Sequence, residues 1–320
     1  MMTKEIIAKT NDLSIEQWLE LRKQGIGGSD AAVACGLSKW KSQLELWLEK
    51  TNQAKGKPAG EAAYWGHIME PIIREEFFKR NGLRVKEVPY LFRSKEHPFM
   101  QANIDGCVEE SDGNISLLEI KTANQYASND WEDGLPAAYY IQVQHYLEVC
   151  GLNKAYIAVL IGGNKYKQMS VERDEETIGN VIKLEKAFWR YVQKRMQPPI
   201  DGSDASREIL ASLYPRSTNT RIMLPPEADP LVSTYLSAKA AEDAAKAQKQ
   251  LSENSLKDLM KDAECGQTPQ GARIYWKSIT SVRINGSKLK ADLPEIAEKY
   301  STETSSRRFA ITAPEAGEKE

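Results

Sequence analysis

The spacing of apolar and polar residues changes several times between residues 14 and 197. Apolar residues that recur every three or four positions predict helices, and short alternating runs bounded by turn residues predict strands. The predicted helices are residues 14–25, 30–35, 42–51, 62–82, 136–151 and 175–196. The predicted strands are residues 84–93, 99–110, 115–123, 155–163 and 167–174. Helices and strands in this order are typical of an α/β or α+β fold.

The pattern becomes simpler after residue 197. Proline, glycine, aspartate and serine cluster in residues 197–206, which indicates a boundary. Small and apolar residues then recur every three or four positions over residues 229–264, which predicts one long helix suited to close helix pairing or a coiled coil. The other predicted elements are a hairpin over residues 271–290, a strand over 306–312 and a disordered tail over 313–320. We therefore expect a core, a linker, a long helix and a small C-terminal segment, which cover residues 1–200, 201–226, 227–265 and 266–320.

Composition places the chain among ordinary globular proteins and leaves its partner open. Of its 320 residues, 41% are hydrophobic and 28% are charged, and the net charge is −2. This charge neither requires nor excludes a nucleic-acid partner. No signal peptide and no run of about 18 apolar residues is apparent, so we expect a cytoplasmic protein without a membrane partner. The cysteines have no CxxC spacing, so we expect no zinc cluster and reduced thiols at Cys35, Cys107, Cys150 and Cys265.

Candidate chemistry begins in the predicted strand with the sequence SLLEIKTA. Side chains alternate along a strand, so Glu119 and Lys121 share one face while Leu118 and Ile120 share the other. A tight SDGN turn would fold this strand onto the preceding one and bring Asp105 near the glutamate. Two carboxylates at one place repel each other, and a hard cation such as Mg²⁺ removes that cost. Such a set is suited to phosphodiester hydrolysis, although an exposed strand face with a simple Glu–Lys pair is a competing interpretation.

Two helical features favour a site over a plain strand face. Glu70 lies in a predicted helix beside Pro71 and could provide a third carboxylate. Gln142 and Tyr146 are four residues apart and therefore share a helix face, from which the amide could order a phosphate or a water molecule. Each of these polar residues could instead be a solvated side chain on a helix surface.

A glycine-rich segment provides a further candidate binding site. Gly27 and Gly28 could hold the backbone in a nest of N–H groups, with Ser29 as the cap of the next helix. A helix start of this kind binds anions, and Arg22 could add a bidentate phosphate contact. The competing interpretation is a plain glycine turn followed by a capped helix.

Together these residues resemble a known family. The order and spacing of the motif residues resemble those of the YqaJ-like viral recombinases, phage-type alkaline exonucleases related to lambda exonuclease within the PD-(D/E)xK nuclease superfamily. The resemblance covers about residues 14–197, and its residues are Arg22, Ser29, Glu70, Asp105, Glu119, Lys121, Gln142 and Tyr146. Asn103 stands two positions before the aspartate, so the PD of the superfamily name is absent. The resemblance implies a core with a central mixed sheet flanked by helices, followed by the long helix and a small β-containing appendage.

The resemblance also implies roles for the candidate residues. Asp105, Glu119 and Glu70 would bind Mg²⁺ or Mn²⁺, with two ions in the site. Lys121 would act on the nucleophilic water, and Gln142 would support the site and the DNA. The 5′-phosphate would be held by Arg22 and Ser29.

The implied activity is a Mg²⁺-dependent 5′-to-3′ exonuclease that acts on the ends of linear double-stranded DNA and leaves 3′ single-stranded overhangs. The implied partner is a single-strand annealing protein (RecT/Bet-like) in phage-type recombination. The implied assembly is a homo-oligomeric ring, a trimer or a tetramer, encoded by a phage or prophage and located in the bacterial host cell.

Two alternatives remain open at this point. One is a related repair or CRISPR-adaptation nuclease with an iron–sulfur cluster, which would need a quartet of clustered cysteines. The other is a protein with an inactive nuclease fold that only binds DNA ends or a recombination partner. The complete set of Asp105, Glu119 and Lys121 argues against an inactive site.

Overall fold

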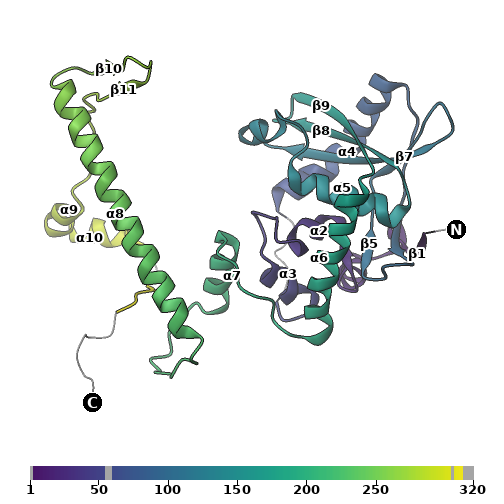
Figure 1. The fold of residues 1–320 in the computed structure, drawn as a ribbon, viewed down its shortest axis with the longest axis horizontal. Coiled ribbons are helices and arrows are strands. Elements are labelled where there is room, and N and C mark those ends of the chain that lie inside the picture. The colour runs from purple at the N-terminus through teal and green to yellow at the C-terminus, as the bar shows by residue number, and fades with distance from the viewer. Residues whose placement is uncertain (1–2, 55–59, 304–305, 313–320) are drawn as a thin grey trace. The chain divides into compact units, whose positions relative to one another are not determined.

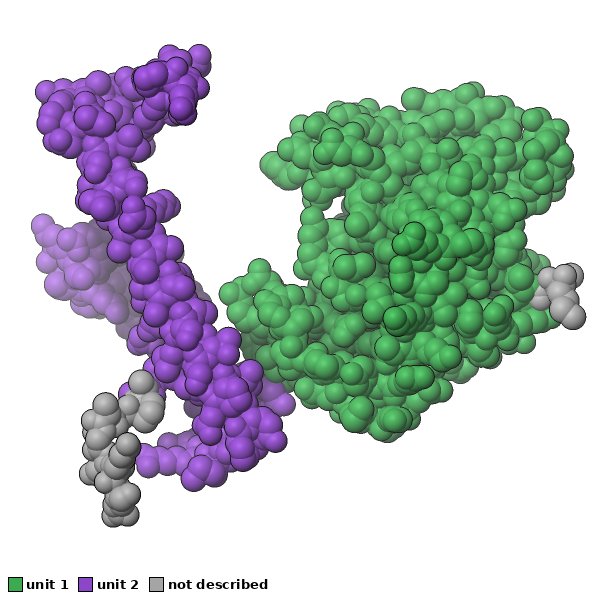
Figure 2. Space-filling model, viewed as in Figure 1, with its two compact units in different colours: residues 1–213 green, residues 214–320 purple. Residues whose placement is uncertain are grey.

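The chain forms two compact units, residues 1–213 and residues 214–320 (Figure 2). The computed structural model describes residues 3–54, 60–303 and 306–312. None of the helices in these residues combines the length and the hydrophobicity that a membrane span requires.

Residues 1–213 have a mixed α/β fold, as the sequence predicts. The strands are β1 (Lys4–Lys9), β2 (Ile26–Gly27), β3 (Val85–Lys86), β4 (Tyr90–Ser94), β5 (Met100–Ala102), β6 (Gly106–Glu109), β7 (Ile115–Ala123), β8 (Lys154–Ile161) and β9 (Lys165–Glu172). The helices are α1 (Ile15–Arg22), α2 (Gly28–Ala34), α3 (Gln43–Lys50), α4 (Glu61–Asn81), α5 (Ala137–Cys150), α6 (Glu175–Lys194) and α7 (Asp204–Leu213). One sheet has the order β1-β4-β5-β2 and the other β3-β6-β7-β8-β9. Each sheet is mixed, because β2–β5 and β7–β8 are parallel and the other pairs are antiparallel.

Helices α4 and α5 pack against the five-stranded sheet through opposite faces of β7 (Figure 1). Ile73 and Phe77 of α4 belong to the same buried cluster as Leu118 of β7. Val143 of α5 belongs to the cluster that contains Leu117 of β7. Since side chains alternate along a strand, the odd-numbered residues of β7 lie on the side of α5. The two charged residues of this strand therefore point toward α5.

The chain changes sheets at Asp105. The predicted single strand over residues 99–110 is wrong, because β5 and β6 belong to different sheets. Gly106 pairs with Leu118, so Asp105 lies one step beyond this ladder, at the level of Glu119. Sequence alternation continues through the segment and gives no sign that the partner strand changes. The break leaves the aspartate carboxylate free to accept a hydrogen bond from the β7 backbone.

Most helix ends follow the predicted capping chemistry. The side chain of Ser14 and that of Gln17 form a reciprocal capping box at the start of α1. Helix α5 begins after Pro136 and ends at Gly151, whose φ of 63° is left-handed. Helix α4 continues on both sides of Pro71. Strand β1 and helix α7 were not predicted, since one precedes the first recognised helix and the other overlaps the predicted boundary.

Residues 214–320 contain the predicted long helix but differ from the sequence prediction around it. The elements are α8 (Ala228–Met260), β10 (Cys265–Gln267), β11 (Arg273–Tyr275), α9 (Gly286–Asp292) and α10 (Pro294–Lys299). The predicted hairpin over 271–290 is wrong, because β11 pairs with the preceding β10. The side chain of Asn285 accepts a hydrogen bond from the Lys288 N–H at 3.0 Å and caps α9, so Asn-Gly starts a helix here. The predicted strand over 306–312 is also wrong, and the predicted tail over 313–320 lies outside the described residues.

A buried ion pair joins α5 to α6. Nδ1 of His145 lies 2.7 Å from Oε1 of Glu185, and Nε2 lies 2.8 Å from the backbone oxygen of Gln101. Both neighbours are acceptors, so the ring donates from both nitrogens and carries a positive charge. Burial opposes that charge, but the glutamate and the carbonyl raise the pKa of His145. The contact holds α5, α6 and β5 together beneath the face that carries the candidate site.

We predict that Glu185→Ala lowers the free energy of unfolding of residues 1–213 by about 3–5 kcal/mol, since it leaves a buried imidazolium without its counterion. The matched control is Lys186→Ala on the exposed side of the same helix turn, which should change it by less than about 0.5 kcal/mol. Urea unfolding followed by tryptophan fluorescence reports this unit, because six of the seven tryptophans precede residue 214. Equal effects of the two substitutions would contradict the buried ion pair.

Candidate active site

Asp105, Glu119 and Lys121 lie together at the end of the β6–β7 ladder. Oε1 of Glu119 accepts a hydrogen bond from Nε2 of Gln142 at 2.6 Å and lies 2.5 Å from Nζ of Lys121. Oδ2 of Asp105 accepts a hydrogen bond from the backbone N–H of Ile120 at 2.7 Å. The other oxygen of Glu119, Oε2, is buried and has no hydrogen-bond partner among the described residues.

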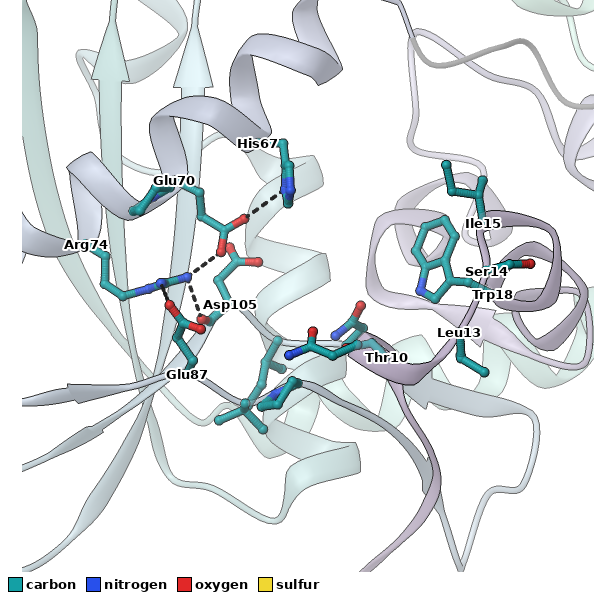
Figure 3. A pocket seen from close by; sticks show the side chains of 16 residues that line it. Thr10, Leu13, Ser14, Ile15, Trp18, His67, Glu70, Arg74, Glu87 and Asp105 are labelled. Atoms are coloured by element: carbon teal, nitrogen blue, oxygen red, sulfur yellow. Dashed lines mark hydrogen bonds and ion pairs between the residues drawn. The ribbon is translucent and has the colours of Figure 1, made fainter.

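Glu70 reaches the same place from α4, with an arginine beside it. Figure 3 shows the carboxylates of Glu70 and Asp105 pointing toward each other, with Arg74 next to both. Arg74 forms ion pairs with Glu70 and Glu87 and donates to the backbone oxygen of Asp105 at 3.3 Å. His67 lies 3.8 Å from Glu70. Arg74 is not among the residues predicted from the sequence, although its four-residue spacing from Glu70 on a helix is a usable signal.

Burial raises the pKa values of all three carboxyl groups, and the charge of Asp105 adds to this for Glu119 and Glu70. Burial, and then the charge of Asp105, raises the pKa of Glu119 to about 8. Burial also raises the pKa of Asp105, and burial together with Asp105 raises that of Glu70. Burial opposes the charge of Lys121, but Glu119 and Asp105 raise its pKa above the usual range. At neutral pH the site therefore holds an ammonium group and more carboxyls than it can ionise together.

This chemistry fits a divalent cation. A buried carboxylate oxygen without a partner costs free energy, and a hard cation binds such oxygens and disfavours the proton that would otherwise remain on the glutamate. The acidic groups line a cavity of about 320 Å³. Glu119, Asp105 and Glu70 would hold the cation there.

The ligand oxygens of Glu70, Asp105 and Glu119 do not all lie within 4.8 Å of one another. One group of described residues has its ligand atoms all within 4.8 Å of one another, and it is Glu96, His97 and Glu148. In that group Arg173 already lies 2.5 Å from Glu148. The group does not include any residue of the candidate active site.

Gln142 and Tyr146 share a face of α5, as their spacing predicts, and this face separates two cavities. Nε2 of Gln142 also lies 3.3 Å from the hydroxyl oxygen of Tyr146. Tyr146 lines the acidic cavity and a second cavity of about 120 Å³, which is lined also by Arg22 and Ser29. One buried side chain therefore stands between the acidic residues and the predicted phosphate pocket.

Arg22 is held in a fixed position in the second cavity. Its Nη2 donates to Oγ of Ser29 at 2.8 Å and lies 3.4 Å from Oδ1 of Asp30, and its guanidinium lies 4.8 Å from the centre of the Trp18 ring. Asp30 also pairs with Lys50 at 2.7 Å. Burial opposes ionisation of Asp30, but Lys50 and Arg22 hold its pKa well below the usual range. These contacts orient the guanidinium and leave other N–H groups of it to bind an anion.

The predicted role of the two glycines is wrong. Gly27 has an extended backbone, with φ of −84°, and its N–H points to Oδ2 of Asp30 at 3.4 Å, so the residues form no nest. Gly27 is also the N-cap of α2, which places Ser29 inside the first turn. Gly28 is required for a different reason, because a Cβ atom there would lie 2.3 Å from the ring of Tyr146. The absence of a side chain lets α2 touch α5 directly.

Comparison with known proteins shows what this chain is similar to. Residues 17–153 match the YqaJ-like viral recombinase domain. The chain is 40% identical over 313 residues to the uncharacterised protein YqaJ of Bacillus subtilis (strain 168), an alignment that covers 96% of this chain and 97% of that one. The alkaline exonuclease LHK-Exo of Laribacter hongkongensis, solved in complex with dAMP, is 22% identical with a TM-score of 0.48 over 62% of this chain and 99% of that chain. A phage-related exonuclease of Haemophilus somnus 129PT is 13% identical with a TM-score of 0.44 over 56% of this chain and 98% of that chain.

We predict that Gly28→Ala lowers the free energy of unfolding by about 1–3 kcal/mol, because the added methyl group overlaps Tyr146. The matched control is Gly179→Ala on the exposed face of α6, where nothing lies within 4 Å of the new Cβ atom. The control should stabilise the protein by about 0.5–1 kcal/mol, because alanine favours a helix interior. Urea unfolding measures both, and a stabilising Gly28→Ala would show that α2 and α5 are not in contact.

Proposed function

The chain belongs to the YqaJ-like viral recombinase family. We propose that it is a nuclease that degrades one strand of linear double-stranded DNA from its 5′ end. The proposed reaction requires Mg²⁺ or Mn²⁺, with two ions, and leaves a 3′ single-stranded overhang. A single-strand annealing protein of the same phage or prophage would bind the overhang for recombination in the bacterial cytoplasm.

The observation that carries this proposal is the buried Glu119 with one unpartnered oxygen beside Asp105 and Lys121. A buried carboxylate oxygen without a partner costs free energy, and this glutamate lines a cavity together with two further carboxylates. The raised pKa values and the open cavity beside these groups are typical of a site that binds a ligand. Family membership supports the view that the ligand is a cation used in nucleic-acid cleavage.

A divalent cation held by these carboxylates would activate a water molecule and neutralise charge on the phosphate. The chain itself supplies the geometry. Lys121 retains its proton and can donate it as a hydrogen bond to a water or a phosphate oxygen in the cavity. Gln142 fixes the rotamer of Glu119, and Arg74 fixes that of Glu70.

The neighbouring cavity supports the proposed preference for a 5′ end. Arg22 and Ser29 provide donors for a terminal phosphate, and Tyr146 forms the wall between this cavity and the acidic one. A strand whose terminal phosphate lies against Arg22 would thus lie with its first linkages near Asp105 and Glu119. Internal positions of a closed circle have no terminal phosphate to place there.

We predict that Asp105→Asn lowers the rate on linear duplex by on the order of 10²–10³-fold or more, because it removes one charge from the site. The substitution keeps the shape and the acceptor for Ile120, so the unfolding transition should be unchanged. Glu109→Gln on the exposed end of β6 is the matched control and should keep the wild-type rate.

The assay follows nucleotides released from end-labelled linear and closed circular duplex, with and without Mg²⁺. Calorimetric titration with Mn²⁺ gives a second readout. Mn²⁺ binding should weaken in Asp105→Asn and stay unchanged in Glu109→Gln. A wild-type rate for Asp105→Asn contradicts the assignment of the site. A wild-type protein that binds duplex ends but cleaves nothing in Mg²⁺ or Mn²⁺ is a DNA-end binding protein instead.

We also predict that duplex with 5′-phosphate ends is degraded about 10–100-fold faster than duplex with 5′-hydroxyl ends, since charge-assisted hydrogen bonds to a phosphate are strong. Arg22→Gln should reduce the rate on phosphorylated ends to that on hydroxyl ends, and Ser29→Ala should have a smaller effect in the same direction. Arg190→Gln removes the same charge from an exposed position on α6 and should preserve the preference. Equal wild-type rates on both ends would show that this cavity does not bind the phosphate.

A further inference from the structure

The middle of α8 has no packing partner among the described residues of its own unit, residues 214–320. All residues from 237 to 256 are exposed, and we call this stretch the bare segment. The ring contacts of α8 lie on either side of it, where Tyr235 meets Phe309 at 5.8 Å and Lys257 lies 5.7 Å from the Trp276 ring. Most of the stability of a helix in a protein comes from the tertiary packing of one of its faces. The bare segment therefore lacks the tertiary contact that usually stabilises such a helix.

One face of α8 is uncharged along its whole length. Positions at alternating three- and four-residue steps form a stripe with leucines at its ends and small residues in its middle. The stripe consists of Leu231, Thr234, Ala238, Ala241, Ala245, Gln248, Ser252, Ser255 and Leu259. All nine charged residues of the helix lie off this stripe. A 3.5-residue repeat without charges is the pattern of a helix that pairs with another helix, and small residues allow a short distance between the two axes.

The residues beside the stripe determine the orientation of the pair. One flank consists of Tyr235, Glu242, Lys249 and Leu256, which follow one another at seven-residue steps. In an antiparallel pair centred near residue 246, this flank faces the same flank of the second helix, so Glu242 meets Lys249 twice and Tyr235 meets Leu256 twice. The opposite flank consists of Ser237, Ala244, Leu251 and Asp258. In a parallel pair this opposite flank would face the first flank of the second helix. It has no residue of opposite charge at the level of Glu242 or Lys249.

The charges of the flank are available for such contacts. Lys249 takes part in no ion pair within the described residues, and Glu242 uses one oxygen on Lys246 at 2.6 Å within its own helix. A carboxylate can accept a second cation on its other oxygen. Only a partner with the reverse order of charges matches this flank, and a second copy in the antiparallel orientation has that order.

We propose that α8 pairs with α8 of a second copy of this chain, as an antiparallel two-helix coiled coil with a two-fold axis near residue 246. The contact is isologous, so each matched pair occurs twice. It goes beyond the proposed nuclease function and uses no residue of the candidate active site. It differs from a ring formed through residues 1–213, because α8 alone carries it.

The test measures the mass of the full chain by sedimentation at several concentrations and at low salt. Wild type should form dimers or assemblies with an even number of chains. Glu242→Lys and Lys249→Glu should each weaken this association by on the order of tenfold or more, since attraction becomes repulsion at two places. A mixture of the two variants, in which opposite charges meet again, should recover the wild-type mass.

Two further variants test whether the effect depends on the position of the charge on the helix. Asp243→Lys makes the same charge change as Glu242→Lys on the other side of the helix and should leave the mass unchanged. Ala245→Glu places a charge in the stripe beside the two-fold axis and should abolish pairing.

The proposal is overturned if the wild type is a monomer at all concentrations, or if Glu242→Lys, Lys249→Glu and Ala245→Glu all leave the mass unchanged. It is also overturned if Asp243→Lys weakens association as much as Glu242→Lys, or if the mixture fails to recover the mass. Helicity measured by circular dichroism confirms that each variant still forms the helix. The mass does not depend on nuclease activity, so this proposal and the proposed function can fail separately.

Discussion

The cost of burying negative charge is the constraint on which residues 1–213 depend. Glu119 lies on the central strand β7 and is only 3% exposed, so water solvates its carboxylate poorly. The buried charge of Glu119 is compensated by an ion pair with Lys121 on the same strand and by a hydrogen bond from Gln142 on α5. The compensation is incomplete, because one oxygen has no partner among the described residues and the pKa rises to about 8. A sheet stabilised for its own sake would carry an apolar residue at this position, so the remaining cost indicates a ligand.

The contact between α2 and α5 fixes the position of Tyr146, the side chain that separates the two cavities. Tyr146 is buried against Gly28, so its ring cannot move without displacing a helix. Arg22 on one side of it is held by Asp30, and Gln142 on the other side is held by Glu119. The separation between the predicted phosphate pocket and the acidic residues is therefore set by one rigid side chain. Under the proposed function, this separation determines how far from the strand end cleavage occurs.

The parts of the fold that depend on local chemistry could be predicted from the sequence. The capping box at Ser14, the stops at Gly82 and Gly151 and the alternation of β7 all depend on residues close together in the chain. The change of sheet at Asp105 depends on which strands pair, which no local pattern encodes. The segment around Asn285 was wrongly predicted for a related reason, because Asn-Gly suits a hairpin turn and a helix start equally well.

The candidate site shows the same division between local and tertiary information. Its acidic residues and Lys121 could be named from their types and spacing, and the structure brings them together. The contacts of Arg74 to three separate groups depend on the packing of α4 against the sheet, so only its spacing from Glu70 could be recognised from the sequence. Oε2 of Glu119 and the bare segment of α8 are then comparable, since each lacks, among the described residues of its own unit, a partner that folding normally supplies. Glu119 lacks a positive charge beside the cavity, and the bare segment lacks a surface to pack against. Every residue of the candidate site comes from residues 1–213 of one chain, so pairing through α8 changes how many sites an assembly contains and leaves the chemistry of each site unchanged.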